Sequence, residues 1–291
     1  MADTSHKSQT PSLRKTLTLS LIMAVIWWIA AMLIRQLDVL HVWTDQQDKF
    51  TLAASNFFDP YRGMSGFFSP PWAVIPLVPF EFMPLPLATL LQALTYFGLL
   101  GWIAHRYGIR LIGLVAAMLS PLALDAVLEL NIDWIAAIGL VVPPVWSPIF
   151  LAVKPQSFTG YIFTLTWQQI VRATSIMLGA ILLSFLIWGV DWLEGLTLEF
   201  STRSLALNAS ISLWGFMPIL SILLGVALLA YAFYRQDDVL KILSGVFFAP
   251  YLPTYTAIIP FLFLCIRYPR FGFYVSIGLW LITATILGPV L

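Results

Sequence analysis

The sequence predicts an all-α protein, a polytopic bundle of transmembrane helices in one domain. Two features of its composition support this: 60% of the 291 residues are hydrophobic and only 10% are charged, whereas soluble domains contain about 25% charged residues. The third observation is a series of apolar runs close to the ~20 residues that cross about 30 Å of hydrocarbon. We expect about seven full spans, a surface-lying or re-entrant segment at 67–82, and a hairpin of short helices at 242–266.

The first predicted elements are a polar tail and a membrane anchor. Residues 1–12 lack apolar periodicity and are expected to form a disordered cytoplasmic tail. The run at 17–37 is longer than the hydrophobic region of a signal peptide, and no small-x-small site follows it, so we interpret it as a retained anchor. An outer loop is expected at 38–67. The remaining spans are expected at 85–104, 111–128, 134–153, 173–190, 209–234 and 273–291.

The basic residues orient these spans. If each run crosses once, eleven of the 15 Lys and Arg residues lie on the side of the N-terminus. The others are Arg35, Lys49, Arg62 and Arg203. Because cytoplasmic segments carry the excess of Lys and Arg, we predict a multi-pass protein of the plasma membrane with a cytoplasmic N-terminus. Most carboxylates fall outside, and the net charge of +1 gives no indication of nucleic-acid binding.

The segment 67–82 is interrupted by prolines and does not read as a regular span. Arg62 is expected outside and Arg106 inside, so the chain between them crosses an odd number of times. One full span at 85–104 satisfies this condition. The segment 67–82 is therefore expected to lie on the membrane surface or to re-enter it.

The segment 242–266 lies between two basic residues that are both expected inside, Lys241 and Arg267. The number of crossings must then be even, but about 25 residues are too few for two full helices at 1.5 Å per residue. Two short helices that meet around 250–253, or a re-entrant hairpin, would fit. The alternative is one tilted span with proline kinks.

Acidic side chains in the outer loop are the first candidates for chemistry. Asp45 and Asp48 are three residues apart, which places both on one face of a helix if Thr44 caps it. A carboxylate at the mouth of a membrane cavity can take a proton from an acceptor hydroxyl. The alternative is a solvated loop whose acids keep it soluble.

A second acidic group contains Asp125, Glu129 and Asp133, with Asn131 between the last two. Their four-residue spacing stacks the first two on one helical face, and the third if the helix continues. This group is either a solvated helix end or a second wall of the same cavity, because carboxylates within membranes usually face the bundle interior. Lys154 is interpreted as closing a span at its inner end.

No metal or cofactor site is predicted. The three histidines are scattered, and the single cysteine, Cys265, lies in an apolar run, so no set has the spacing of a zinc site. Asp45, Asp48 and Asp59 could hold a divalent cation through oxygen, but their spacing does not require one. The sequence also lacks a phosphate-binding loop, a nucleophile elbow and a dinucleotide fingerprint.

The order of several motifs resembles that of membrane glycosyltransferases of the GT-C type, notably bacterial polyprenyl-phosphomannose-dependent mannosyltransferase-like proteins. In that family the first span leads into a long outer loop with an acidic residue, an Ala-Ala pair, an Asn/Asp-Pro-Tyr and an aromatic-Pro-Pro segment. The similar residues here are Asp45 or Asp48, Ala53-Ala54, Asp59-Pro60-Tyr61, Phe68-Ser69-Pro70-Pro71 and Pro76 to Pro84. Later similarities are Asn131 to Asp133, Lys154-Pro155-Gln156, Pro250-Tyr251 and Tyr255-Thr256.

This resemblance implies transfer of a mannose-like sugar from a polyprenyl-phosphate donor to an outer-leaflet or extracytoplasmic acceptor of unknown identity. It implies Asp45 as the general base, with Asp48 next in line. The leaving phosphate needs neutralisation, for which Arg62 and Arg203 are the candidates. Other residues implied at the substrates are Asp59, Tyr61, Asn131, Asp133, Tyr251 and Tyr255. The implied partners are the lipid bilayer, the donor lipid and other membrane proteins.

Three departures from the family pattern keep an alternative open. Thr256 stands where an acid is expected, Leu130 replaces a glycine before Asn131, and 291 residues is short for the family. The alternative is a non-catalytic scaffold subunit, or a lipid or solute transporter on a similar bundle. A transporter is expected to show internal repeats, and no convincing repeat is visible in the sequence.

Overall fold

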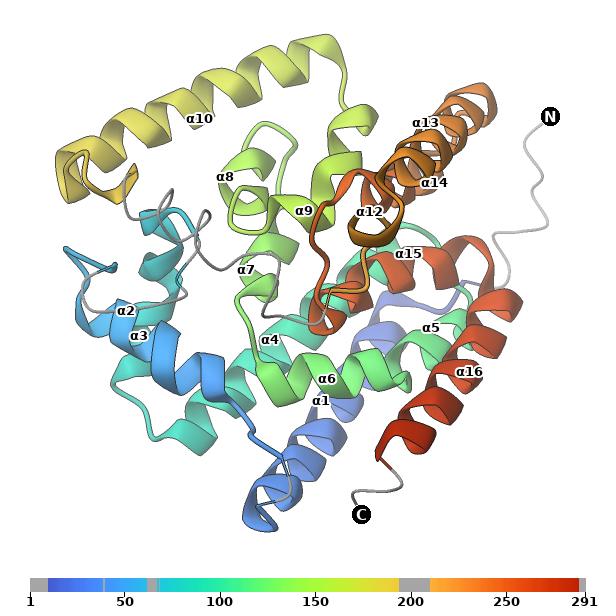
Figure 1. The fold of residues 1–291 in the computed structure, drawn as a ribbon, viewed down its shortest axis with the longest axis horizontal. Helices are drawn as coiled ribbons and strands as arrows, with labels where there is room; N and C mark the ends of the chain where they lie inside the picture. The colour runs from blue at the N-terminus through green and yellow to red at the C-terminus, as the bar shows by residue number, and fades with distance from the viewer. Residues whose placement is uncertain (1–9, 39, 62–66, 68, 194–209, 288–291) are drawn as a thin grey trace.

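The structure, a computed structural model, describes residues 10–38, 40–61, 67, 69–193 and 210–287 (Figure 1). Within these ranges the protein is an all-helical bundle without a β-strand, and 77% of it is helix. The helices are α1 (Leu13–Gln36), η2 (Gln46–Phe50), α2 (Thr51–Ser55), η3 (Pro71–Leu77), α3 (Val78–Glu81), α4 (Leu85–Arg106), α5 (Leu111–Met118), α6 (Pro121–Glu129), α7 (Asp133–Ile138), α8 (Ser147–Leu151), α9 (Pro155–Phe158), η4 (Thr159–Thr164), α10 (Trp167–Trp188), α12 (Leu213–Phe216), α13 (Pro218–Arg235), α14 (Asp238–Ser244), η5 (Gly245–Phe248), η6 (Thr254–Ala257), α15 (Ile258–Arg267) and α16 (Pro269–Leu287).

Four of the described helices are long and apolar enough to cross a membrane, namely α1, α4, α10 and α13. The pair α5 and α6 adds a fifth crossing if it is one span, although its two helices are bent by 47°. These helices are consistent with a membrane protein. The expected number of about seven full spans is not reached in the described part of the chain.

The expected span at 134–153 is one that the structure contradicts. Only α7 and α8 are helical there, because Gly139 and the prolines at 143, 144 and 148 interrupt the backbone hydrogen bonds. Lys154 Nζ lies 3.9 Å from Asp133 Oδ2, so the two ends of the segment meet. The segment is therefore a hairpin, and the interpretation of Lys154 as the inner end of a span that begins outside is wrong.

The predicted hairpin at 242–266 is confirmed. Helix α14 and η5 lead to an extended stretch between Pro250 and Pro253, and η6 and α15 lead back. The side chains of Asp237 and Arg267, at the two open ends, form an ion pair of 2.6 Å. The alternative of one tilted span is excluded. The segment 67–82 contains only η3 and α3 and is also not a spanning helix, as predicted.

Helices α1 and α4 pack closely through small residues. The buried face of α1 includes Ser20, Ala24 and Ala31, and a Cβ atom on Gly101 of α4 would lie only 2.6 Å from the Ser20 hydroxyl. Small residues of this kind let transmembrane helices approach each other. Trp28 Nε1 adds a 3.1 Å hydrogen bond to the α4 hydroxyl of Thr89.

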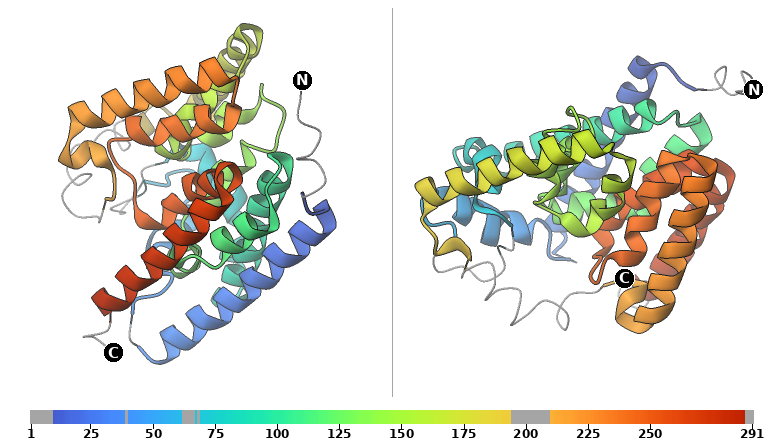
Figure 2. Two further views of the ribbon diagram at one scale, coloured as in Figure 1. Left: turned by 90° about the vertical axis from the view of Figure 1, so that its right-hand side faces the viewer. Right: turned by 90° about the horizontal axis from the view of Figure 1, so that it is seen from above.

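The bend between α5 and α6 is stabilised by two tryptophans. Trp27 Nε1 on α1 donates to the carbonyl of Met118 at 2.7 Å, and Trp280 Nε1 on α16 donates to the carbonyl of Leu119 at 2.7 Å. The two indole rings contact each other with centroids 6.1 Å apart. Figure 2 shows α1, α5 and α16 on the same side of the bundle. Helix α6 then restarts at Ser120, whose hydroxyl accepts from a backbone N–H of its first turn.

Candidate functional site

The loop that carries Asp45 is fixed to the end of α6 by Trp43. The Trp43 backbone N–H donates to the carbonyl of Leu128 at 2.8 Å, and its indole N–H donates to the carbonyl of Val127 at 2.9 Å. Trp43 is fully buried and has a positive φ of 60°, which turns the chain into the π-helical segment η2. The last carbonyls of a helix lack hydrogen-bond donors within the helix. Here the indole and backbone N–H groups of Trp43 donate to two of these carbonyls.

Asp45 is held by two side chains. Its Oδ2 accepts a 2.6 Å hydrogen bond from the amide of Asn131, and its Oδ1 forms an ion pair with Lys49, one turn along the chain. The Asn131 Oδ1 accepts from the backbone N–H of Ile132 at 2.8 Å, which fixes the orientation of the amide. Leu130, at a φ of 41°, ends α6 in a left-handed conformation and so directs Asn131 toward Asp45. The Asp45 side chain keeps 13% exposure.

Asp133 lies deeper and has three neighbours. It is 1% exposed, and its Oδ1 accepts a 2.8 Å hydrogen bond from the hydroxyl of Thr256. Lys154 Nζ is 3.9 Å from its Oδ2 and 5.2 Å from the centre of the Tyr255 ring. Asp133 lies outside the candidate spans; burial raises the pKa of its carboxyl, while Lys154 and the Thr256 hydrogen bond lower it. The ammonium therefore lies between a carboxylate and an aromatic face.

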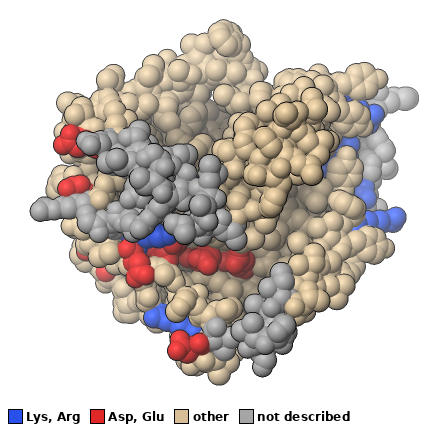
Figure 3. All heavy atoms as spheres, viewed as in Figure 1, with Lys and Arg blue, Asp and Glu red and all other residues tan. Residues whose placement is uncertain are grey.

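Tyr255 connects the two carboxylates. Burial raises the pKa of its phenol, and electrostatic interactions with Asp133, Tyr251 and Asp45 raise it further. Asn131, which binds Asp45, lies two residues before Asp133, and Lys154 contacts both Asp133 and Tyr255, so these residues form one site. We call Asp45, Asn131, Asp133, Lys154 and Tyr255 the central polar site. In Figure 3 acidic side chains gather in a hollow in the middle of the face, and basic side chains lie along the right-hand edge of the molecule.

The structure thus brings together four of the candidate residues from the sequence, Asp45, Asn131, Asp133 and Tyr255, and Tyr251 lies close enough to act on Tyr255. It does not bring in Asp48, which is exposed. Thr44 is already helical, and the wider turn of η2 rotates Asp48 away from the face of Asp45. The expectation that both carboxylates share a face is wrong.

The candidates from the end of the outer loop lie elsewhere or cannot be placed. Asp59 is exposed, and the hydroxyl of Tyr61 donates to the backbone carbonyl of Ser69 at 2.5 Å. This contact closes the loop on itself, and burial raises the pKa of the Tyr61 phenol. Arg62 and Arg203 lie outside the described residues.

The second acidic group is divided by the turn at Leu130. Asp125 and Glu129 belong to α6, whereas Asp133 is the first residue of α7. The stack of three carboxylates on one helical face is therefore not formed. Instead, the left-handed residue turns the chain so that Asp133 faces Thr256 and Lys154.

Two cations that pair with the carboxylates of the site, Lys49 and Lys154, are not among the candidates from the sequence. Lys49 was counted only as an outer charge, and Lys154 was interpreted as a helix end. The signal for Lys154 was present in the sequence, because the prolines at 143, 144 and 148 make a continuous span before it implausible. Thr256 was noted as a departure from an expected acid, and it contributes the hydrogen bond that Asp133 accepts.

Within the described part of the chain, no group of three or more His, Cys, Asp or Glu side chains is arranged to hold a metal ion. The option of a divalent cation at Asp45, Asp48 and Asp59 is therefore not supported. Comparison of the chain with protein-family models, with curated proteins and with solved structures gives no match.

Proposed function

We propose that this protein is a membrane glycosyltransferase that transfers a sugar from a polyprenyl-phosphate donor to a hydroxyl of an outer acceptor. The observation that supports this proposal is the convergence of Asp45, Asn131, Asp133, Lys154 and Tyr255, from segments far apart in the chain, into the central polar site. A buried set of opposite charges costs desolvation energy. Such a cost is typical of sites that act on a ligand.

Asp45 is the general base in this proposal. Its carboxylate is oriented by Asn131 and remains partly exposed, so an acceptor hydroxyl can reach it where Lys49 now lies. The acceptor oxygen forms the new bond to the anomeric carbon while the bond from that carbon to the phosphate oxygen breaks. The bonding electrons leave with the polyprenyl phosphate, and the hydroxyl proton passes to Asp45.

Lys154 stabilises the leaving phosphate. The Lys154 side chain is 12% exposed, and the distance of 3.9 Å from its Nζ to Asp133 Oδ2 is longer than a normal hydrogen bond. An ammonium has three donors, so Lys154 can form charge-assisted hydrogen bonds to phosphate oxygens without first losing a short contact to Asp133. Arg62 and Arg203 remain candidates for the same task.

The alternative proposal is a non-catalytic scaffold subunit. It is favoured by the internal pairing of the site, because Asp45 has Lys49 and Asp133 has Lys154. It is also favoured by the exposed apolar faces of α10 and α13: only 11% of the spanning window of α10 and 17% of that of α13 is buried. Such faces suit lipid or other membrane proteins.

The test uses purified protein in lipid nanodiscs with polyprenyl-phosphate mannose, and measures release of polyprenyl phosphate. Asp45→Asn keeps the shape of the side chain but removes the base, so the rate should fall by about 10²- to 10⁴-fold. Asp48→Asn is the matched control, because Asp48 lies three residues away in the same segment and is exposed. If the wild type consumes no donor, or if both variants behave alike, the scaffold interpretation replaces this proposal.

A further inference from the structure

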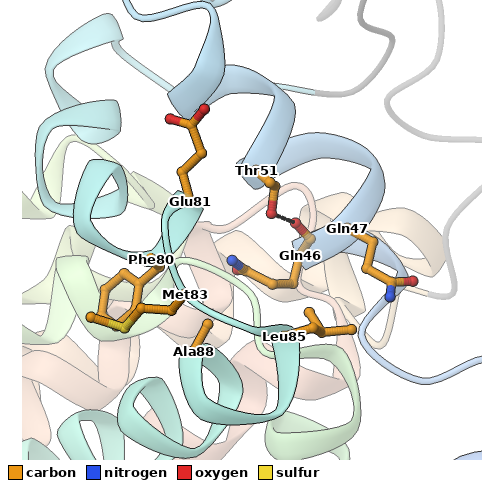
Figure 4. Close-up of a pocket in the computed structure, with 8 residues that line it drawn as sticks. All are labelled: Gln46, Gln47, Thr51, Phe80, Glu81, Met83, Leu85 and Ala88. Atoms are coloured by element: carbon orange, nitrogen blue, oxygen red, sulfur yellow. Dashed lines mark hydrogen bonds between the residues drawn. The ribbon is translucent and has the colours of Figure 1, made fainter.

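A cavity of about 290 Å³ lies between η2 and α2 on one side and α3 and the start of α4 on the other (Figure 4). It is lined by Gln46, Gln47, Thr51, Phe80, Glu81, Met83, Leu85 and Ala88. Gln46 directly follows the proposed base in the chain. The cavity is therefore formed in part by the segment that follows Asp45, whereas Lys154 does not line it.

Gln46 is the residue that points to a ligand. It is 2% exposed, and its Oε1 has no hydrogen-bond partner among the described residues. Figure 4 shows its side chain extending from η2 toward Phe80 and Met83. Its backbone is fixed, because the Thr51 hydroxyl donates to the Gln46 carbonyl at 2.7 Å. A buried amide oxygen without a partner destabilises the fold, so a hydroxyl donor from a ligand would offset that loss.

The two walls of the cavity indicate the chemistry of this ligand. The wall formed by η2 and α2 is polar, with Gln46, Gln47 and Thr51. The wall formed by α3 and α4 is apolar from Phe80 through Met83 and Leu85 to Ala88, apart from Glu81 at the end of α3. Among the described residues, no lysine or arginine lines the cavity, which disfavours an anion. A sugar ring carries hydroxyls at its edge and C–H groups on its faces, and it matches both walls.

The size and rigidity of the cavity agree with a single ring. Its volume is close to the lower end of the 300–1,000 Å³ typical of small-molecule sites. Phe80 packs edge-to-face on Trp134, with ring centroids 5.9 Å apart, and Trp134 directly follows Asp133. The apolar wall is therefore held by α7, the same helix that begins at the central polar site.

We infer that this cavity is the acceptor subsite, and that it binds an uncharged sugar ring through a hydroxyl donated to Gln46 Oε1. This inference rests on the proposed function. The ring belongs either to a soluble saccharide or to the headgroup of a glycolipid, and both present the same chemistry. Asp45 is the N-cap residue of η2, the helix that contributes Gln46 and Gln47 to the cavity wall, so the proposed base and the subsite belong to one segment of the chain.

Binding without donor tests the subsite independently of catalysis. The probes are methyl α-mannoside, methyl α-glucoside, methyl α-galactoside and the octyl α-glycoside of each sugar, titrated by saturation-transfer NMR against the protein in nanodiscs. Gln46→Leu removes the amide at similar size and should weaken glycoside binding at least tenfold without lowering thermal stability. Ala88→Met, which fills the cavity, should also weaken glycoside binding at least tenfold. Ser55→Ala is the control, because Ser55 is exposed and does not line the cavity.

Each outcome bears on the inference. Methyl glycoside binding that Gln46→Leu removes supports a saccharide acceptor, and octyl glycoside binding alone, removed by the same variant, supports a glycolipid acceptor. Octyl glycoside binding that Gln46→Leu leaves unchanged is a nonspecific interaction of the alkyl chain and overturns the subsite. The absence of binding by every probe also overturns it. Donor consumption by the wild type would in those two cases leave the proposed function intact.

Discussion

Replacing Lys154 by methionine should destabilise the protein by about 3–5 kcal/mol, the usual cost of removing one partner from a buried ion pair. The structure explains why the effect should be large. Lys154 Nζ lies 3.9 Å from Asp133 Oδ2, and the two side chains are only 12% and 1% exposed. At an effective dielectric constant of about 20, two unit charges at this distance attract each other by about 4 kcal/mol. Without Lys154, the carboxyl of Asp133 would retain its Thr256 hydrogen bond but would have to stay charged without that cation or take up a proton, and either change costs free energy.

The assay is reversible unfolding by SDS in mixed micelles, applied to Lys154→Met, Asp133→Asn and the double variant. The double variant should recover at least half of the larger single loss, because neither charge is then buried alone. Lys241→Met is the matched control: Lys241 pairs with Asp238 at 2.8 Å, but Asp238 is 56% exposed and remains solvated, so the loss of that ion pair should cost below about 1 kcal/mol. If Lys154→Met costs no more than this control, or if the single effects simply add, the pair does not stabilise the site.

Two further predictions concern packing and topology. Gly160→Ala should cost about 1–3 kcal/mol in the same unfolding assay, because its Cβ would lie 2.5 Å from a backbone carbonyl oxygen of α14; Gly179→Ala, which meets no atom within 4 Å, should cost nothing. Asp48→Cys should react with an impermeant maleimide in intact cells, whereas Tyr234→Cys should react only after lysis, because both positions are exposed and basic residues place Tyr234 inside. If Tyr234→Cys reacts in intact cells and Asp48→Cys reacts only after lysis, the proposed orientation in the membrane is wrong.

The sequence predicted long apolar helices well and broken ones poorly. Helices α1, α4, α10 and α13 were all expected from apolar runs of sufficient length. The run at 134–153 is also apolar but forms the short helices α7 and α8. The sequence pattern does not predict this, because periodicity alone does not distinguish a spanning helix from short buried helices. The hairpin at 242–266 is predictable because Lys241 and Arg267 at its two ends are both expected inside, which requires an even number of membrane crossings between them. The ion pair of Asp237 with Arg267 shows that the two ends lie together.

The candidate site shows a similar division. Asp45, Asn131, Asp133 and Tyr255 were selected by the order of motifs along the chain, and they lie in one site. Local spacing was less informative: a regular helix would put Asp48 beside Asp45, but η2 is π-helical. The role of Lys154 depends on the return of the chain after α7, a tertiary feature that no local pattern contains.

The two tryptophans at the bend between α5 and α6 link the integrity of this span to the order of synthesis. Water is absent from the hydrocarbon core, so each carbonyl that the bend releases needs a donor from protein. Trp27 belongs to α1 and is made before the bend, whereas Trp280 belongs to α16 and is made about 160 residues after it. The carbonyl of Leu119 thus gains its indole donor only when α16 has been inserted.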